Sequence, residues 1–256
     1  MSDANGGLVL AHGAGGSVAA NYGPVMDTLT AGRTVVGADY PGTGGTPRSD
    51  RPLELDALAD GLVAAADAAG LDRFAVSGYS LGAPVAVRLA TRHPDRVTAL
   101  VLTAPFAHAD AELRLNARVW QALCGTGDPD TLGRFLLARC LSPAALDAMT
   151  PHELEAAAKE TGATAPEGAA DHVDLVIRAD VRADLDRIDV PALVVSPVDD
   201  GLVPPRLHRA VAAGIPGARL VEVPGGHLPF VECPAEWGAL ISEFSTTARV
   251  ARPGAE

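Results

Sequence analysis

The sequence predicts an α/β domain with a mostly parallel sheet of about six strands, flanked by helices. Short apolar runs of strand length alternate with segments of helical periodicity in the first and last parts of the chain, and glycine-rich turns follow several of these runs. A long helical block without strand signals interrupts the alternation. Strands that alternate with helices in this way indicate a parallel sheet covered on both faces.

The composition describes a soluble globular protein. The chain has 256 residues, of which 48% are hydrophobic and 20% are charged, which suits one large domain or a domain with a sizeable insertion. Its formal net charge of -12 argues against nucleic acid or an anionic membrane as the natural partner. A small molecule is the expected partner.

The sequence favours a cytoplasmic location. Residues 1–7 are short and polar and contain no apolar signal region, and no run approaches the ~18 apolar residues of a membrane span. Cys124, Cys140 and Cys233 are widely spaced and odd in number. They indicate reduced thiols rather than disulfides or a metal site.

The first part of the chain alternates strands and helices, and the glycine-rich loop 12–17 follows the first apolar run. The long turn 39–46 follows the second run, and Gly70 ends the second helical segment. The expected strands are 8–11, 34–38, 74–76 and 97–102, and the expected helices are 24–31, 53–69 and 83–90.

A helical block occupies the middle of the chain, over residues 109–178, with breaks at Gly and Pro clusters. We interpret it as an insertion set over the carboxyl ends of the strands. The predicted division is a core of residues 1–106 and 180–256 with a cap of residues 107–179. The core resumes with expected strands at 192–196 and 219–223, helices at 207–213 and 235–246, and a frayed tail at 249–256.

The segment Gly78-Tyr79-Ser80-Leu81-Gly82 fits the pattern G-x-S-x-G and lies between a predicted strand and a predicted helix. Glycines without a Cβ let strand and helix approach closely around a strained serine. The backbone N–H of Leu81 then lies at the helix N-terminus, where a developing negative charge is stabilised. The alternative is a Gly/Ser-rich turn with an ordinary N-cap serine; the flanking elements favour Ser80 as a nucleophile.

A serine nucleophile needs a base, and His227 is the leading candidate because it lies in a loop after the last predicted strand. The alternative is a turn histidine with a solvated ring. The other six histidines have different expected roles: His12 supports the first loop, His93 ends a helix, His208 lies on a helix surface, and His108, His152 and His172 fall in or beside the insertion, where nothing selects one for substrate contact.

The orienting acid should follow the strand 192–196, where Asp199 and Asp200 are adjacent. Neighbouring residues of an extended loop point to different sides, so only one of them can face His227. The backbone N–H of Ala14, in the first glycine-rich loop, is well placed as a second oxyanion donor. A phosphate loop is the weaker interpretation, because no Gly-Lys-Ser/Thr follows.

Taken together, these motifs resemble those of the α/β-hydrolase fold family, in its esterase, lactonase, cofactor-free haloperoxidase and C–C hydrolase branch. They occur in the family's order of nucleophile, acid and base. The resemblance implies Asp200 as the triad acid, four residues before Pro204 in a D-x-x-[VI]-P pattern, and Ala14 and Leu81 as oxyanion donors. It implies no metal or organic cofactor.

The chain departs from the family pattern in two places. Members usually carry an antiparallel strand pair before the first glycine-rich loop, and here only seven residues precede Leu8, so we expect this pair to be missing. The strand 34–38 would then be a sheet edge, through which a homodimer is possible. Ala14 stands where relatives often have a bulky aromatic residue, which suggests more room beside the serine.

The resulting expectation is a serine hydrolase that cleaves an ester, lactone or thioester of a small to medium, mainly apolar substrate through an acyl-enzyme. A biosynthetic acyltransferase or cyclase, or a C–C bond hydrolase, would use the same triad, and a non-catalytic ligand-binding protein is a further alternative. Tyr79, Phe106 and Trp120 are the candidate substrate-binding residues. Most apolar residues of the insertion are expected to pack the cap onto the core.

Overall fold

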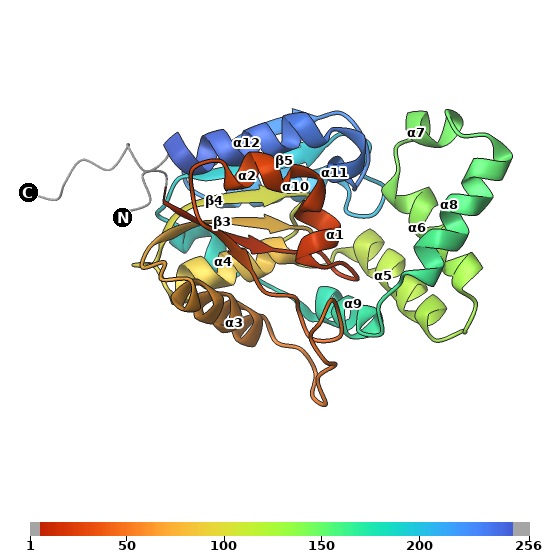
Figure 1. The fold of residues 1–256 in the computed structure, drawn as a ribbon, viewed down its shortest axis with the longest axis horizontal. Coiled ribbons are helices and arrows are strands. Elements are labelled where there is room, and N and C mark those ends of the chain that lie inside the picture. The colour runs from red at the N-terminus through yellow and green to blue at the C-terminus, as the bar shows by residue number, and fades with distance from the viewer. Residues whose placement is uncertain (1–5, 248–256) are drawn as a thin grey trace, which may run out of the picture.

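The computed structural model describes residues 6–247, whose centre is a six-stranded sheet in the order β2-β1-β3-β4-β5-β6 (Figure 1). All neighbouring strands pair in parallel, so their carboxyl ends share one edge. The strands are β1 (Gly7–Ala11), β2 (Val35–Gly37), β3 (Phe74–Tyr79), β4 (Val97–Thr103), β5 (Ala192–Pro197) and β6 (Arg219–Val223). The predicted six-stranded α/β architecture is confirmed.

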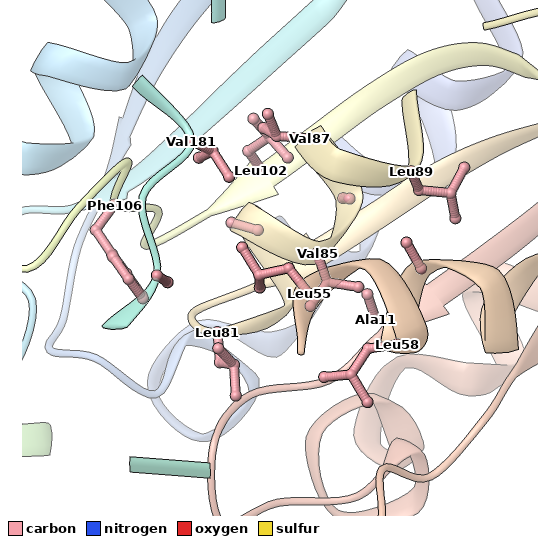
Figure 2. Packing of buried hydrophobic residues seen from close by; sticks show 14 of the residues in the cluster. Ala11, Leu55, Leu58, Leu81, Val85, Val87, Leu89, Leu102, Phe106 and Val181 are labelled. Atoms are coloured by element: carbon pink, nitrogen blue, oxygen red, sulfur yellow. The ribbon is translucent and has the colours of Figure 1, made fainter. Parts of the chain in front are cut away.

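Helices cover both faces of the sheet, and each face has its own buried apolar cluster. Successive residues of a strand point to opposite faces, so Val9 and Val76 belong to one cluster and Leu8 and Ala75 to the other. The first face carries α3 (Leu55–Ala68), α4 (Gly82–Arg92) and α10 (Pro205–Gly214), and the second carries α1 (Val18–Tyr22), α2 (Met26–Thr30) and α12 (Pro234–Thr247). Figure 2 shows side chains of the first cluster, among them Leu55, Leu58, Val85, Leu89 and Leu102.

Five helices between β4 and β5 form a separate layer, called the cap below, beyond the carboxyl ends of β3 and β4 (Figure 1). They are α5 (Ala111–Cys124), α6 (Pro129–Cys140), α7 (Pro143–Asp147), α8 (Pro151–Ala163) and α9 (Ala169–Arg178). Side chains of Asp110, Asp128, Ser142 and Thr150 accept a backbone N–H at the start of the first four. The sequence encodes these helix starts locally.

The cap packs closely because two glycines let α6 and α8 touch. A Cβ added at Gly133 would collide with the carbonyl oxygen of Ala158, and one at Gly162 would collide with that of Pro129. Without side chains at these positions, the helix backbones come into direct contact. Sequence periodicity predicts the helices but not this pairing.

Several short elements were not predicted from the sequence. The expected helix 24–31 is divided into a 3₁₀ turn (Gly23–Val25) and α2, and α1 precedes them. Ser17 starts α1 early because its side chain accepts the N–H of Ala20. The other unpredicted elements are the 3₁₀ helix Arg182–Arg187 and α11 (Pro229–Glu232). The expected frayed tail, 249–256, lies outside the described residues.

The edge strand β2 is three residues long and half-buried. Within residues 6–247, no strand pairs with its outer side, as expected for a sheet without the extra strand pair. Pairing of this edge with a second copy of the chain stays a prediction, which the mass in solution tests. Among the described helices, none is long and apolar enough to cross a membrane.

Candidate active site

Ser80 lies in a strained turn between β3 and α4. Its φ of 52° is in the left-handed region, which non-glycine residues rarely adopt. A Cβ at Gly78 would collide with the carbonyl oxygen of Gly82, and one at Gly82 would collide with that of Ala11. Both glycines of the G-x-S-x-G pattern are therefore required by close backbone contacts, as predicted.

Three residues distant in the sequence meet at the carboxyl edge of the sheet. The Ser80 hydroxyl lies 3.0 Å from His227 Nε2, and His227 Nδ1 lies 2.7 Å from Asp200 Oδ2. All three are buried, with exposed fractions of 6%, 3% and 4%. Since the carboxylate accepts the Nδ1 proton, Nε2 carries a lone pair that accepts the serine proton. The three side chains form one continuous chain of hydrogen bonds.

The loop after β5 selects which of the two adjacent carboxylates faces the histidine. The Oδ1 atom of Asp200 accepts the backbone N–H groups of Leu202 at 3.0 Å and Val203 at 2.8 Å, which leaves Oδ2 for His227. Asp199 is exposed. The two amide donors hold the carboxylate in this orientation.

The prediction that His208 lies on a helix surface is wrong, because its side chain is completely buried. Its Nδ1 lies 2.9 Å from Ser196 Oγ, and its Nε2 lies 3.5 Å from Asp200 Oδ2. Burial lowers the pKa of His208 from 6.5 to about 4, so the ring is neutral at pH 7. The helix faces β5 through Leu207 and Val211, and His208 shares that buried side. The helical spacing of His208 relative to Leu207 and Val211 was the sequence signal that could have placed it on the buried side.

The first glycine-rich loop is held from both sides. The N–H of Tyr40 donates to His12 Nε2 at 2.9 Å, which places the ring proton on Nδ1, where it donates to the carbonyl of Gly13 at 2.8 Å. The N–H of Gly13 in turn donates to the side chain of Asn21 at 2.9 Å. His12 supports this loop, as predicted, and burial lowers its pKa to about 4.

The cap supplies a second histidine to the same loop. His172 of α9 accepts the N–H of Gly15 at Nδ1, over 3.2 Å, and donates from Nε2 to the carbonyl of Pro41, over 3.0 Å. Burial lowers its pKa, which keeps Nδ1 free to accept. Among the three insertion histidines that the sequence left undecided, His172 is the one that joins cap and core at the site.

Asn116 of the cap and Glu232 of core helix α11 hold the loops that carry Asp200 and His227. The amide of Asn116 in α5 donates to the carbonyl of Leu202 at 3.1 Å, beside Asp200. Glu232 accepts the N–H of Gly226, next to the base, at 2.8 Å and that of Ser142 in the cap at 3.2 Å. Sequence reasoning missed these residues, because nothing local distinguishes an asparagine or a glutamate that makes a long-range contact.

A cavity of about 150 Å³ opens above Ser80, between the first loop, the base and the cap. Tyr79 and Trp120 both line it, while Phe106 lines a smaller adjoining space. The Tyr79 hydroxyl is already used, since it donates to the backbone carbonyl of His227 at 3.0 Å. A Cβ at Gly15 would lie 3.0 Å from the Trp120 ring. Trp120 therefore occupies space above the first loop.

The titratable groups of the site do not form a metal centre. Among residues 6–247, no group of three His, Cys, Asp or Glu side chains is placed to hold a metal ion. Cys140 lines the cavity as a free thiol, and burial raises its pKa.

Comparison with known proteins agrees with this geometry. The sequence profile of the family described as alpha/beta hydrolase fold matches residues 7–234, most of the chain. The chain belongs to the α/β-hydrolase family. A pyrrolizixenacetamide deacetylase of Xenorhabdus hominickii is 33% identical over 240 residues, which cover 93% of this chain and 90% of that protein.

Two further similarities agree with the family assignment. A pimeloyl-[acyl-carrier protein] methyl ester esterase of Neisseria meningitidis serogroup B is 33% identical over 252 residues, covering 95% of this chain and 94% of that protein. The structure of a hydrolase from Pseudomonas aeruginosa has 27% sequence identity and a TM-score of 0.80, covering 94% and 89% of the two chains. The expectation of an α/β-hydrolase enzyme is confirmed.

Proposed function

We propose that this α/β hydrolase cleaves a small, mainly apolar ester, lactone or thioester through an acyl-enzyme on Ser80. The observation that carries the proposal is the continuous hydrogen-bond relay from Ser80 through His227 to Asp200, with distances of 3.0 and 2.7 Å. A serine at the elbow forms an acyl intermediate when a base removes its proton. The small cavity above it suits a substrate of modest size.

In the first half of the reaction, Ser80 Oγ attacks the substrate carbonyl carbon while His227 Nε2 takes the hydroxyl proton. The carbonyl oxygen becomes an oxyanion, and the backbone N–H groups of Ala14 and Leu81 are its proposed donors. Leu81 is the N-cap residue of α4, where the helix dipole also favours negative charge. His227 then gives its proton to the leaving group, whose bond to the acyl carbon breaks.

In the second half, His227 removes a proton from water, which attacks the acyl carbon. The bond between this carbon and Ser80 Oγ then breaks, His227 returns the proton to Oγ, and the acid leaves. The buried Asp200 carboxylate stabilises the imidazolium that forms in both halves. The cap supports each step from outside, because it contacts the loops that carry the first donor and the acid directly, and the loop that carries the base through Glu232. None of these steps needs a metal or organic cofactor.

The relatives support reaction at an acyl carbonyl. One is named a deacetylase and another a methyl ester esterase. The acyltransferase, cyclase and C–C hydrolase alternatives share the same relay. Reaction in ¹⁸O-labelled water separates transfer from hydrolysis: hydrolysis places one ¹⁸O atom in the released acid, whereas transfer to another acceptor leaves the product unlabelled.

A fluorophosphonate probe tests the proposal directly, because it reacts only with an activated serine. We expect stoichiometric labelling of the folded protein, located on Ser80 by peptide mass spectrometry, and no labelling of Ser80→Ala. A folded wild-type protein that stays unlabelled would instead support a non-catalytic ligand-binding role. Location in the cytoplasm belongs to the proposal as well, and is supported by three cysteines that form no disulfide.

A further inference from the structure

The space above Ser80 has two unequal parts, which we call the large lobe and the small lobe. Both are lined by Ala14, Ser80, Trp120 and Leu202, so they adjoin at the nucleophile. The large lobe has a volume of about 150 Å³ and the small lobe about 10 Å³. This difference in size limits which side of a substrate each lobe can hold.

The two lobes differ in their catalytic groups. His227 lines the large lobe, together with Gly15 and Gly16 of the first loop. The small lobe contains neither the base nor these glycines. Its remaining wall is apolar and buried, with Phe106 1%, Val173 0% and Val176 6% exposed.

The chemistry of the reaction assigns the substrate to the lobes. The departing oxygen must lie next to His227 Nε2, because it receives its proton there, and His227 lines the large lobe but not the small one. The oxyanion points to the backbone N–H groups of Ala14, which lines both lobes, and Leu81, which lines neither, so it lies at the border between them. Of the groups on the tetrahedral carbon, only the acyl substituent then remains for the small lobe.

We infer that the enzyme accepts an acyl group no larger than acetyl and a bulkier leaving group, an inference that rests on the proposed acyl-enzyme mechanism. The volume of the small lobe is near the lower limit for a cavity that holds one water molecule, which is about the size of one methyl group. Further methylenes would have to displace packed side chains. Each extra methylene in a closed apolar pocket changes specificity by about 10-fold or more.

Two substrate series test the assignment on the wild-type enzyme. In p-nitrophenyl acetate, propionate, butyrate and hexanoate the leaving group is constant, and we expect kcat/KM to fall by about 10-fold or more per methylene. In ethyl, butyl and hexyl acetate the acyl group is constant and the alcohols have similar reactivity. Here kcat/KM should stay level or rise with length, since the large lobe receives the alcohol.

A matched pair of variants tests which wall sets the limit. Val176 of α9 lines only the small lobe, and Leu136 of α6 lines only the large lobe. Val176→Ala should raise the butyrate-to-acetate ratio of kcat/KM by about 10-fold, because it removes two methyl groups from the wall. Leu136→Ala should leave that ratio unchanged while altering the ratio of hexyl to ethyl acetate.

Ala117→Val provides the opposite change, since it fills the small lobe and should reduce activity on the acetate below that of the wild type. The inference is overturned if the wild type prefers butyrate or hexanoate to acetate, or if only Leu136→Ala changes the acyl preference. Either result would place the acyl group in the large lobe. Labelling of Ser80 by the fluorophosphonate probe is independent of acyl length, so it separates this failure from a failure of the mechanism.

Discussion

Replacing Asp200 with asparagine should inactivate the enzyme without changing the shape of the site. Asparagine is isosteric, and its Oδ1 can still accept the N–H groups of Leu202 and Val203. Its NH₂ group then replaces Oδ2, 2.7 Å from His227 Nδ1. Because NH₂ donates, Nδ1 must accept, and the ring proton moves to Nε2, which can no longer take the proton of Ser80.

The expected loss follows from this change of tautomer. A triad histidine fixed in the wrong tautomer reduces kcat by about 10⁴-fold, or about 5.4 kcal/mol of transition-state stabilisation. The assay is kcat on p-nitrophenyl acetate, with thermal unfolding as a check that the variant is folded. Asp199→Asn is the matched control, since this neighbour is exposed, and it should keep kcat within about 2-fold.

Equal losses in the two variants would show that the acid is wrongly assigned. A folded Asp200→Asn protein with more than about a tenth of wild-type kcat would refute the tautomer argument itself. Restoration of kcat at high pH, where hydroxide substitutes for the base, would still agree with it.

Three other predictions concern stability and the cap. Burial lowers the pKa of His12 and His208 to about 4, so the unfolded chain binds more protons than the folded one between pH 6.5 and 4. As the pH is lowered through this range, the free energy of unfolding measured by urea titration should fall by about 1.4 kcal/mol per pH unit for each histidine. A free energy of unfolding that does not change with pH would contradict their burial. Gly82→Ala should yield little folded protein, because the added Cβ would collide with backbone atoms. Gly61→Ala in helix α3 is the control, because a Cβ there meets no neighbouring atom within 4 Å, and it should raise the free energy of unfolding by about 0.5 to 1 kcal/mol in the same titration. His172→Phe removes an acceptor from the first loop and should lower kcat by about 10-fold or more with little change in KM; an unchanged kcat would show that the loop is held without it.

The features that sequence could predict are those encoded locally. The elbow around Ser80 needs two glycines within five residues, and the loop that carries His227 follows a strand directly. Asp200 was separated from Asp199 by the family pattern, because the local spacing alone left both open. The alternation of strands and helices was enough for the sheet, since parallel strands require covering layers.

The features that sequence missed depend on distant contacts. His208 has a polar side chain beside a charged arginine, but it packs under the acid because α10 rests on β5. His172 is separated from Gly15 by 157 positions, and Glu232 from Ser142 by 90. Only the folded chain brings the last two pairs together, so a single sequence carries no signal for them; for His208, the spacing with Leu207 and Val211 was such a signal.

The central claim is that the relay of Ser80, His227 and Asp200 makes one hydroxyl a nucleophile. Rapid mixing with p-nitrophenyl acetate, acid quenching and intact mass spectrometry tests it most directly. The account predicts a transient mass increase of one acetyl group, located on Ser80 and absent from Ser80→Ala and His227→Ala. Turnover of the ester with the acetyl group on another residue, or unchanged turnover by Ser80→Ala, would contradict it.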